Sequence, residues 1–313
     1  MLGKTAGALF WMFRYMERCE NTARLVEAGF YIALTRSKSA EDEWASIIKS
    51  SGNAPKYDAL HEHYTGPEVV DFLLRERSNP SSVLSMIDLA RSNARMARTA
   101  LTREVWEAVN EAWLNICASL KDEVTPKTLP GIIGLIRRQS ALVQGALHGT
   151  MLRNDIYDFA RLGTFIERAD STARILDVKY YVLLPSVSVV GGPMDNVQWE
   201  TILRSVSALQ AYSWVCKGDV TPRGIADFLI LDRTMPRSLA FCEWEVSHNL
   251  SHLSNAYGSI LPCQKMAAEL LEHLCSQTIE AVFEYGLHEF IEDFLETNRK
   301  LAKQIEIDYR FMA

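Results

Sequence analysis

The residues best suited to chemistry in this chain occur in two charged decapeptides that lie 150 positions apart. They are MERCENTARL at residues 16–25 and IERADSTARI at residues 166–175. Six charged residues are identical at matching positions in them: Glu17, Arg18, Arg24, Glu167, Arg168 and Arg174. A glutamate can act as a general acid or base, and an arginine can bind a carboxylate or phosphate through two parallel hydrogen bonds. The two glutamates are therefore candidate catalytic residues.

The surroundings of these charges favour a structural role. On a helix, Glu17 shares one face with Phe10 and Phe13, which places its carboxylate near the core. A buried charge without a partner costs several kcal/mol, so each glutamate needs an arginine from the other decapeptide. The expected pairs are Glu17 with Arg168 or Arg174, and Glu167 with Arg18 or Arg24. A ligand or catalytic site built on the same charges is the alternative.

The elements that must position these residues are helices. Helical periodicity runs through the chain, without strand alternation or hairpin dipeptides, and predicts an all-α fold. The expected helices cover residues 4–36, 40–52, 67–76, 80–101, 104–121, 130–149, 153–185, 195–216, 222–231, 235–257, 263–285 and 287–310. Four proline pairs are expected to open helices, because proline is tolerated at the first helical position: Gly66-Pro67, Asn79-Pro80, Thr125-Pro126 and Thr221-Pro222.

The two decapeptides belong to a longer internal repeat. The offset of 150 becomes 155 after the loop at residues 186–193, and it is 156 where DFLLRERSNPSS (residues 71–82) matches DFLILDRTMPRS (residues 227–238). Matching segments in the same order predict an internally duplicated helical bundle with pseudo-two-fold symmetry. The repeats are expected at residues 1–150 and 151–313, within one continuous domain. The similarity fades after about residue 100, and the predicted helix at 104–121 has no evident counterpart.

A stripe of arginines distinguishes the two halves. Arg91, Arg95 and Arg98 have the spacing i, i+4 and i+7 of one helix face. The matched positions of the second half are serines: Ser247, Ser251 and Ser254. The stripe is the best candidate for binding an acidic ligand or partner, because guanidinium groups bind carboxylates and phosphates well. A solvated face paired with acidic neighbours is the alternative.

Two further patterns suggest chemistry less strongly. Glu245, His248 and His252 have helical spacing, but a di-metal bundle needs a second Glu-x-x-His, which the chain lacks, so no metal site and no cofactor are expected. Cys19 lies beside Glu20, whose charge disfavours the thiolate, and no histidine is near in the sequence. A cysteine nucleophile is therefore not expected.

Composition narrows the possible partners and location. The formal charge of −6 and the pI near 5.7 exclude a general affinity for nucleic acid or anionic membranes. No apolar stretch approaches the roughly 20 residues of a membrane-spanning helix. The six cysteines form no C-x-x-C pair, which indicates free thiols in a reducing cytoplasm.

The chain resembles the alpha-E family, bacterial all-helical proteins named for a Glu-Arg motif of this type. The resemblance covers essentially the whole chain. Its segments are FWMFRYMERCENTAR (residues 10–24), RSNARMAR (91–98), EVWE (104–107), GTMLR (149–153), RLGTFIERAD (161–170) and DFLILDRTMPRS (227–238). Two departures are small: Cys19 stands where the family usually has alanine, and Thr164 where a basic residue is common.

The resemblance implies a role but no reaction. Alpha-E proteins accompany circularly permuted ATP-grasp ligases and transglutaminase-like proteins, in systems thought to form peptide or amide bonds. The resemblance also suggests that Arg153, with Thr150 and Met151, lines a groove between the halves. We therefore expect an accessory or scaffold protein that docks the ligase or holds its peptide substrate. The alternative is an enzyme of that pathway, with Glu17 or Glu167 as acid or base on a bound peptide or amide.

Overall fold

The computed structural model describes residues 1–35, 40–183, 193–216 and 220–311, and the predicted loop at 186–193 lies almost wholly outside these ranges. The regular structure within them is helical, which confirms the all-α prediction. The helices are α1 (Gly3–Thr35), α2 (Ala40–Ser50), α3 (Ala54–Asp58), α4 (Gly66–Leu74), α5 (Val83–Met96), η1 (Arg98–Ala100), α6 (Arg103–Ser119), α7 (Leu129–Thr150), α8 (Asp155–Leu183), α9 (Pro193–Ser205), α10 (Leu209–Val215), α11 (Pro222–Ile230), α12 (Leu239–Tyr257), α13 (Pro262–Ser276), α14 (Ile279–Tyr285) and α15 (Leu287–Asp308). None of these helices is long and apolar enough to cross a membrane.

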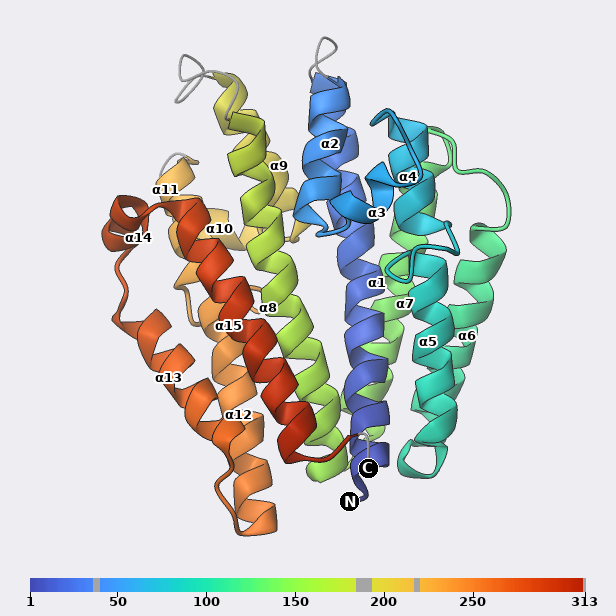
Figure 1. The fold of residues 1–313 in the computed structure, drawn as a ribbon, viewed down its shortest axis with the longest axis vertical. Helices are drawn as coiled ribbons and strands as arrows, with labels where there is room; N and C mark the ends of the chain where they lie inside the picture. The colour runs from blue at the N-terminus through green and yellow to red at the C-terminus, as the bar shows by residue number, and fades with distance from the viewer. Residues whose placement is uncertain (36–39, 184–192, 217–219, 312–313) are drawn as a thin grey trace.

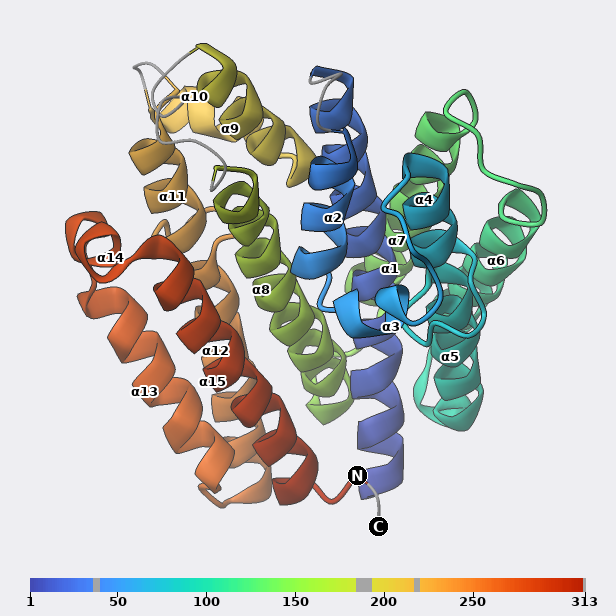
Figure 2. The same ribbon diagram turned by 45° about the horizontal axis from the view of Figure 1, so that its top comes forward.

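The two helices that carry the decapeptides, α1 and α8, lie side by side at the centre of the bundle (Figure 1). Helices α5, α6 and α7 lie on the far side of α1, whereas α12, α13 and α15 lie on the far side of α8 (Figure 2). Contacts match between the halves: α5 and α7 pack on α1 as α12 and α15 pack on α8. Helix α6, which has no evident sequence counterpart, packs on α5 as α13 packs on α12. The duplication and its axis stay predictions, with which these contacts are consistent.

Helix α1 is apolar on several sides because helices surround it. Phe10 and Phe13 have no exposed surface, and α1 contacts α8, α5, α7, α2 and α9. Gly163 of α8 lets the two central helices approach closely, since a Cβ atom there would lie 2.2 Å from the carbonyl oxygen of Phe10. This close approach brings the charged decapeptides within hydrogen-bonding distance of each other.

Two of the four proline pairs open helices as predicted. Helix α4 begins at Gly66, and α11 begins at Pro222 after the capping residue Thr221. The other two predictions are wrong by three residues, because helix α5 begins only after Ser82, whose hydroxyl accepts the Ser85 N–H, and α7 begins at Leu129. A capping side chain directly before a helix, or a turn such as that at residues 125–128, decides the start over a proline upstream.

Three predicted helices are each divided. The helix expected at 80–101 is α5 followed by η1. The helix expected at 195–216 is α9 followed by α10, with Ser207 in a left-handed conformation (φ 56°) between them. The helix expected at 263–285 is α13 followed by α14, since Gln277 is extended and the Thr278 hydroxyl caps α14. The short α3 was not predicted at all. These breaks follow local capping and tertiary contacts that hydrophobic periodicity does not record.

Candidate functional site

Both crossed ion pairs expected from the sequence are present between α1 and α8. Arg168 donates from Nε and Nη2 to the two carboxylate oxygens of Glu17, each at 2.9 Å. Arg18 donates in the same way to Glu167, at 2.5 and 2.7 Å. Each pair is bidentate, the strongest arrangement of these two groups. The pairs therefore fix the register of the central helices.

The second arginine of each decapeptide has a different partner from the one considered in the sequence. Arg24 pairs with Glu20 and Arg174 with Asp170, each on its own helix and each at 2.6 Å. Each arginine also donates to the last carbonyl of a helix from the other half: Arg24 to Ser205 at the end of α9 (2.7 Å), and Arg174 to Ser50 at the end of α2 (3.2 Å). A cation at a helix C-terminus also interacts favourably with the helix dipole.

A third arginine completes each cluster, and here the two clusters differ. Arg237, from the turn before α12, donates to Glu17 at 3.1 Å and to Glu20 at 2.7 Å. Arg14, one turn before Glu17 on α1, donates to Glu167 at 3.0 Å. We call the first group the Glu17 cluster (Glu17, Glu20, Arg24, Arg168 and Arg237). The second is the Glu167 cluster (Arg14, Arg18, Glu167, Asp170 and Arg174).

Sequence reasoning missed Arg237, although the repeat carries the signal. At the offset of 156 the first-half residue that matches Arg237 is Ser81. Arg237 is buried within the Glu17 cluster, whereas Ser81 borders an open cleft beside the Glu167 cluster. A large buried side chain in one half thus corresponds to a small residue and open space in the other.

The cleft beside the Glu167 cluster has a volume of about 550 Å³. Its walls come from α1, the turn between α2 and α3, α3, α4, the loop before α5, α8 and α15. The charged side chains that line it are Arg14, Arg18, Lys56, Glu167, Asp170, Arg174, Glu292, Glu296 and Arg299. A volume of this size is typical of small-molecule sites in proteins.

Exposure confirms that one cluster is open and the other closed. The side chain of Arg18 is 30% exposed, against 14% for its counterpart Arg168, and Arg174 is 33% exposed, against 7% for Arg24. A second difference contributes at the ends of α2 and α9. Ser207 accepts a hydrogen bond from Arg24 at 2.9 Å, whereas the matching residue is a glycine, Gly52. That glycine has a left-handed conformation, and a Cβ atom there would crowd the Arg174 guanidinium.

The electrostatics of the Glu167 cluster suit binding better than acid–base catalysis. Burial alone would raise the pKa of Glu167, but Arg18 and Arg14 outweigh it and lower the pKa to about 2. A general acid or base works best with a pKa near the working pH, so this carboxylate is poorly suited to proton transfer at neutral pH. In the Glu17 cluster, burial would likewise raise the pKa of Glu20, but Arg237 and Arg24 lower it to about 2.

The arginine stripe does not lie on one helix. Helix α5 ends at Met96, so Arg98 belongs to η1. The Arg91 guanidinium lies 4.0 Å from the ring centre of Trp113, and that of Arg98 lies 4.4 Å from Trp106. Both tryptophans belong to α6, so these two arginines hold η1 and α5 against α6, while Arg95 is exposed. The stripe is not part of the cleft lining, and its role in recognition stays a prediction.

Arg153 lies at the turn between α7 and α8, outside the cleft lining. Its guanidinium donates to the carbonyl oxygens of His148 (2.8 Å) and Met151 (3.2 Å) and lies over the ring of Tyr157. Arg153 thus satisfies carbonyl groups at the C-terminal end of α7. The groove that the family resemblance suggested for Arg153 and its neighbours does not coincide with the cleft.

The remaining candidates are engaged elsewhere. Glu245 pairs with Arg161 at 3.2 Å, and His248 stacks on Trp244 rather than converging with Glu245 on one point. His252 faces Asp158 at 3.5 Å. Each of these three side chains thus has its own neighbour among the described residues.

Cys19 has no exposed surface, and its Sγ lies 3.8 Å from the Val83 carbonyl oxygen. Burial raises the pKa of its thiol. An inaccessible, protonated thiol cannot act as a nucleophile.

Fold and site together define a class: an all-helical protein whose two central helices are joined by crossed Glu-Arg pairs. A family model described as Alpha-E, a predicted alpha-helical domain with a conserved ER motif, matches residues 1–309. The chain belongs to this family. Comparison with curated proteins and with solved structures found no match to either.

Proposed function

We propose that the protein is an accessory component of a bacterial peptide- or amide-bond-forming system, and that the cleft beside the Glu167 cluster holds the peptide substrate. Its partners would be a circularly permuted ATP-grasp ligase and a transglutaminase-like protein, as the resemblance to alpha-E proteins implies. The carrying observation is that one of two matching clusters is closed by Arg237, whereas the other opens onto a cleft of about 550 Å³. Six free cysteines support a location in the reducing cytoplasm.

The charges of the cleft suit a peptide with free ends. Arg14 and Arg18 share a single carboxylate, that of Glu167, so positive charge is in excess at the α1 end, and the exposed Lys56 adds to it. At the α15 end, Glu292 supplies negative charge, whereas Glu296 pairs with Lys300 and Arg299. A ligand with a carboxylate at one end and an ammonium group at the other would match both ends. This pattern supports holding a substrate, and the lowered pKa of Glu167 weighs against chemistry by the motif itself.

Filling the cleft tests the proposal with a side chain that the protein already uses. Ser81→Arg introduces the residue found at the matching position of the closed cluster, so it should occupy the cleft without disturbing the core. Ser78→Arg adds the same charge to an exposed position of the same loop, outside the cleft lining. The probe is a pool of dipeptides with free carboxylates, compared by calorimetry with the same pool amidated at the C-terminus. We expect saturable binding of the free pool only, lost in Ser81→Arg and kept in Ser78→Arg.

The accessory role is tested with a circularly permuted ATP-grasp ligase from the same organism. The rate of amide formation is measured with the ligase alone, with the wild-type protein, and with each of the two variants. We expect the wild-type protein and Ser78→Arg to raise the rate and Ser81→Arg to fail. A rate that the wild-type protein leaves unchanged contradicts the accessory role. Equal rates with Ser81→Arg and wild type contradict the cleft as the functional site.

A further inference from the structure

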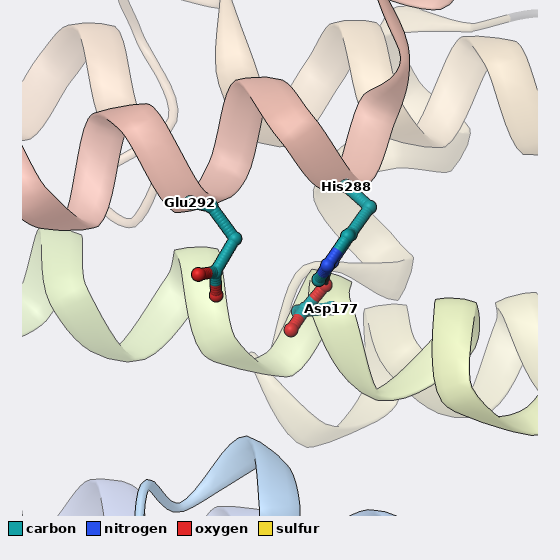
Figure 3. A group of neighbouring side chains, drawn as sticks. All are labelled: Asp177, His288 and Glu292. Atoms are coloured by element: carbon teal, nitrogen blue, oxygen red, sulfur yellow. Dashed lines mark hydrogen bonds and ion pairs between the residues drawn. The ribbon is translucent and has the colours of Figure 1, made fainter.

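A histidine and two carboxylates converge where α15 crosses α8 (Figure 3). Asp177 extends from α8, His288 points toward it from α15, and Glu292, one turn further along α15, extends toward α8 beside them. His288 Nδ1 lies 2.6 Å from Asp177 Oδ1, and one ligand atom from each of the three residues lies within 4.8 Å of the others. Among the described residues, this is the only group of three potential metal-binding side chains whose ligand atoms lie so close together.

The burial of the three side chains is graded from the protein interior to the cleft. Asp177 is buried, His288 is partly buried, and Glu292 is exposed and lines the cleft described above. A site with three protein ligands on one side and solvent on the other resembles metal sites that keep a coordination position open.

We propose that Asp177, His288 and Glu292 bind one divalent transition-metal ion at the α15 end of the cleft. One imidazole and two carboxylates are ligands typical of Zn²⁺, Mn²⁺ or Fe²⁺. Two ligands on one such ion lie about 3–4.4 Å apart, since each bond is roughly 2.0–2.2 Å long. The hydrogen bond between His288 Nδ1 and Asp177 Oδ1, at 2.6 Å, therefore has to open by a few tenths of an ångström when the ion binds. The three ligand atoms lie within 4.8 Å of one another, and the exposed Glu292 side chain can move by the few tenths of an ångström that bring this distance below about 4.4 Å. The open position of the ion would face the cleft and could hold a carbonyl oxygen or the uncharged amino nitrogen at that end of a bound peptide.

The test is a titration of metal-free protein with Co²⁺, followed by visible absorption, and with Zn²⁺ and Mn²⁺, followed by calorimetry. We expect one saturable equivalent for the wild-type protein. Glu292→Gln and His288→Gln should weaken it at least about tenfold, as loss of a ligand does. Because Glu292 is exposed, its variant should fold normally, and circular dichroism checks this. His252→Gln is the matched control, since His252 also faces an aspartate, Asp158, but without a third ligand in the described structure.

Two results would overturn the site: no saturable binding of any of the three ions, or wild-type affinity in both Glu292→Gln and His288→Gln. A loss of affinity in His252→Gln would equally place the ion elsewhere. The titration contains neither peptide nor ligase. Failure of the metal site therefore leaves the proposed substrate cleft standing, and failure of the cleft leaves the metal site standing.

Discussion

Replacing Glu17 by glutamine removes the carboxylate that two buried guanidinium groups share. Glu17 has no exposed surface, and the side chains of Arg168 and Arg237 are only 14% and 11% exposed. Glutamine keeps the shape but not the charge, so both arginines lose a buried counter-charge. Breaking a buried ion pair in this way costs about 3–5 kcal/mol. That is a large part of the roughly 5–15 kcal/mol that stabilises a typical protein.

The matching substitution in the open cluster should cost less. In Glu167→Gln the freed Arg18 borders the cleft and is 30% exposed, so water can replace part of the lost interaction. The expected loss of folding stability is about 1–3 kcal/mol, typical of an unsatisfied polar group that solvent can reach. Glu17→Lys adds a fourth positive charge to the closed cluster, beside Arg24, Arg168 and Arg237, and should prevent folding.

Urea denaturation followed by circular dichroism measures these differences, provided that the dependence on urea stays equal among the variants. A loss in Glu167→Gln equal to or larger than that in Glu17→Gln would refute the distinction between a closed and an open cluster. A soluble Glu17→Lys protein that unfolds cooperatively near the wild-type midpoint would refute the structural role of the ion pairs.

Three further predictions concern stability. The pKa of both Glu20 and Glu167 is lowered to about 2 from an ordinary 4.5. The stability that these two carboxylates contribute is therefore present above pH 4.5 and is lost as the pH falls toward 2. The urea midpoint should fall over this pH range, and it should fall less steeply in Glu167→Gln. Gly52→Ala should lower folding stability by about 1–3 kcal/mol, because φ at Gly52 is +71° and Arg174 is close. Gly145→Ala, in open space on α7, should raise stability by roughly 0.5–1 kcal/mol. Thermal denaturation compares the two variants, and equal effects would contradict the strain at Gly52. Glu243 on α12 is fully buried, its oxygens lack hydrogen-bond partners among the described residues, and burial raises its pKa to about 8, so its share of stability is full below pH 4.5 and lost as the pH rises through 8. Glu243→Leu should therefore stabilise the protein more at pH 9 than at pH 6, and an equal gain at both values would speak against an ionising Glu243.

The crossed pairs could be predicted because two local facts were sufficient. Periodicity placed Glu17 on an apolar face, and the repeat supplied a second helix with an arginine at the matching position. The choice between Arg168 and Arg174 could not be made, since it depends on the crossing of α1 and α8, which Gly163 permits. The helix breaks were missed because Ser207 and Gln277 leave helical geometry through capping and tertiary contacts.

The cleft and the proposed metal site were beyond sequence reasoning for a different reason. Arg237 reaches Glu17 from 220 positions away, and His288 reaches Asp177 from 111 positions away. Nothing in the local pattern around these residues marks them as neighbours. The substitution of Ser81 for Arg237 between the repeats was visible in the sequence, but its meaning depends on knowing that this position faces the decapeptide.

The exchange of helix-capping arginines between the halves has a consequence for synthesis on the ribosome. Arg24 donates to the carbonyl at the end of α9, and Glu17 pairs with Arg168 of α8. The first half therefore leaves the ribosome about 150 residues before the groups that pair with its charges. At ~5–20 residues per second this delay is roughly 8–30 s. During that time α1 cannot enter an apolar environment without burying an unpaired charge. We therefore expect the nascent first half to stay hydrated and loosely packed until α8 emerges, so that the bundle closes late.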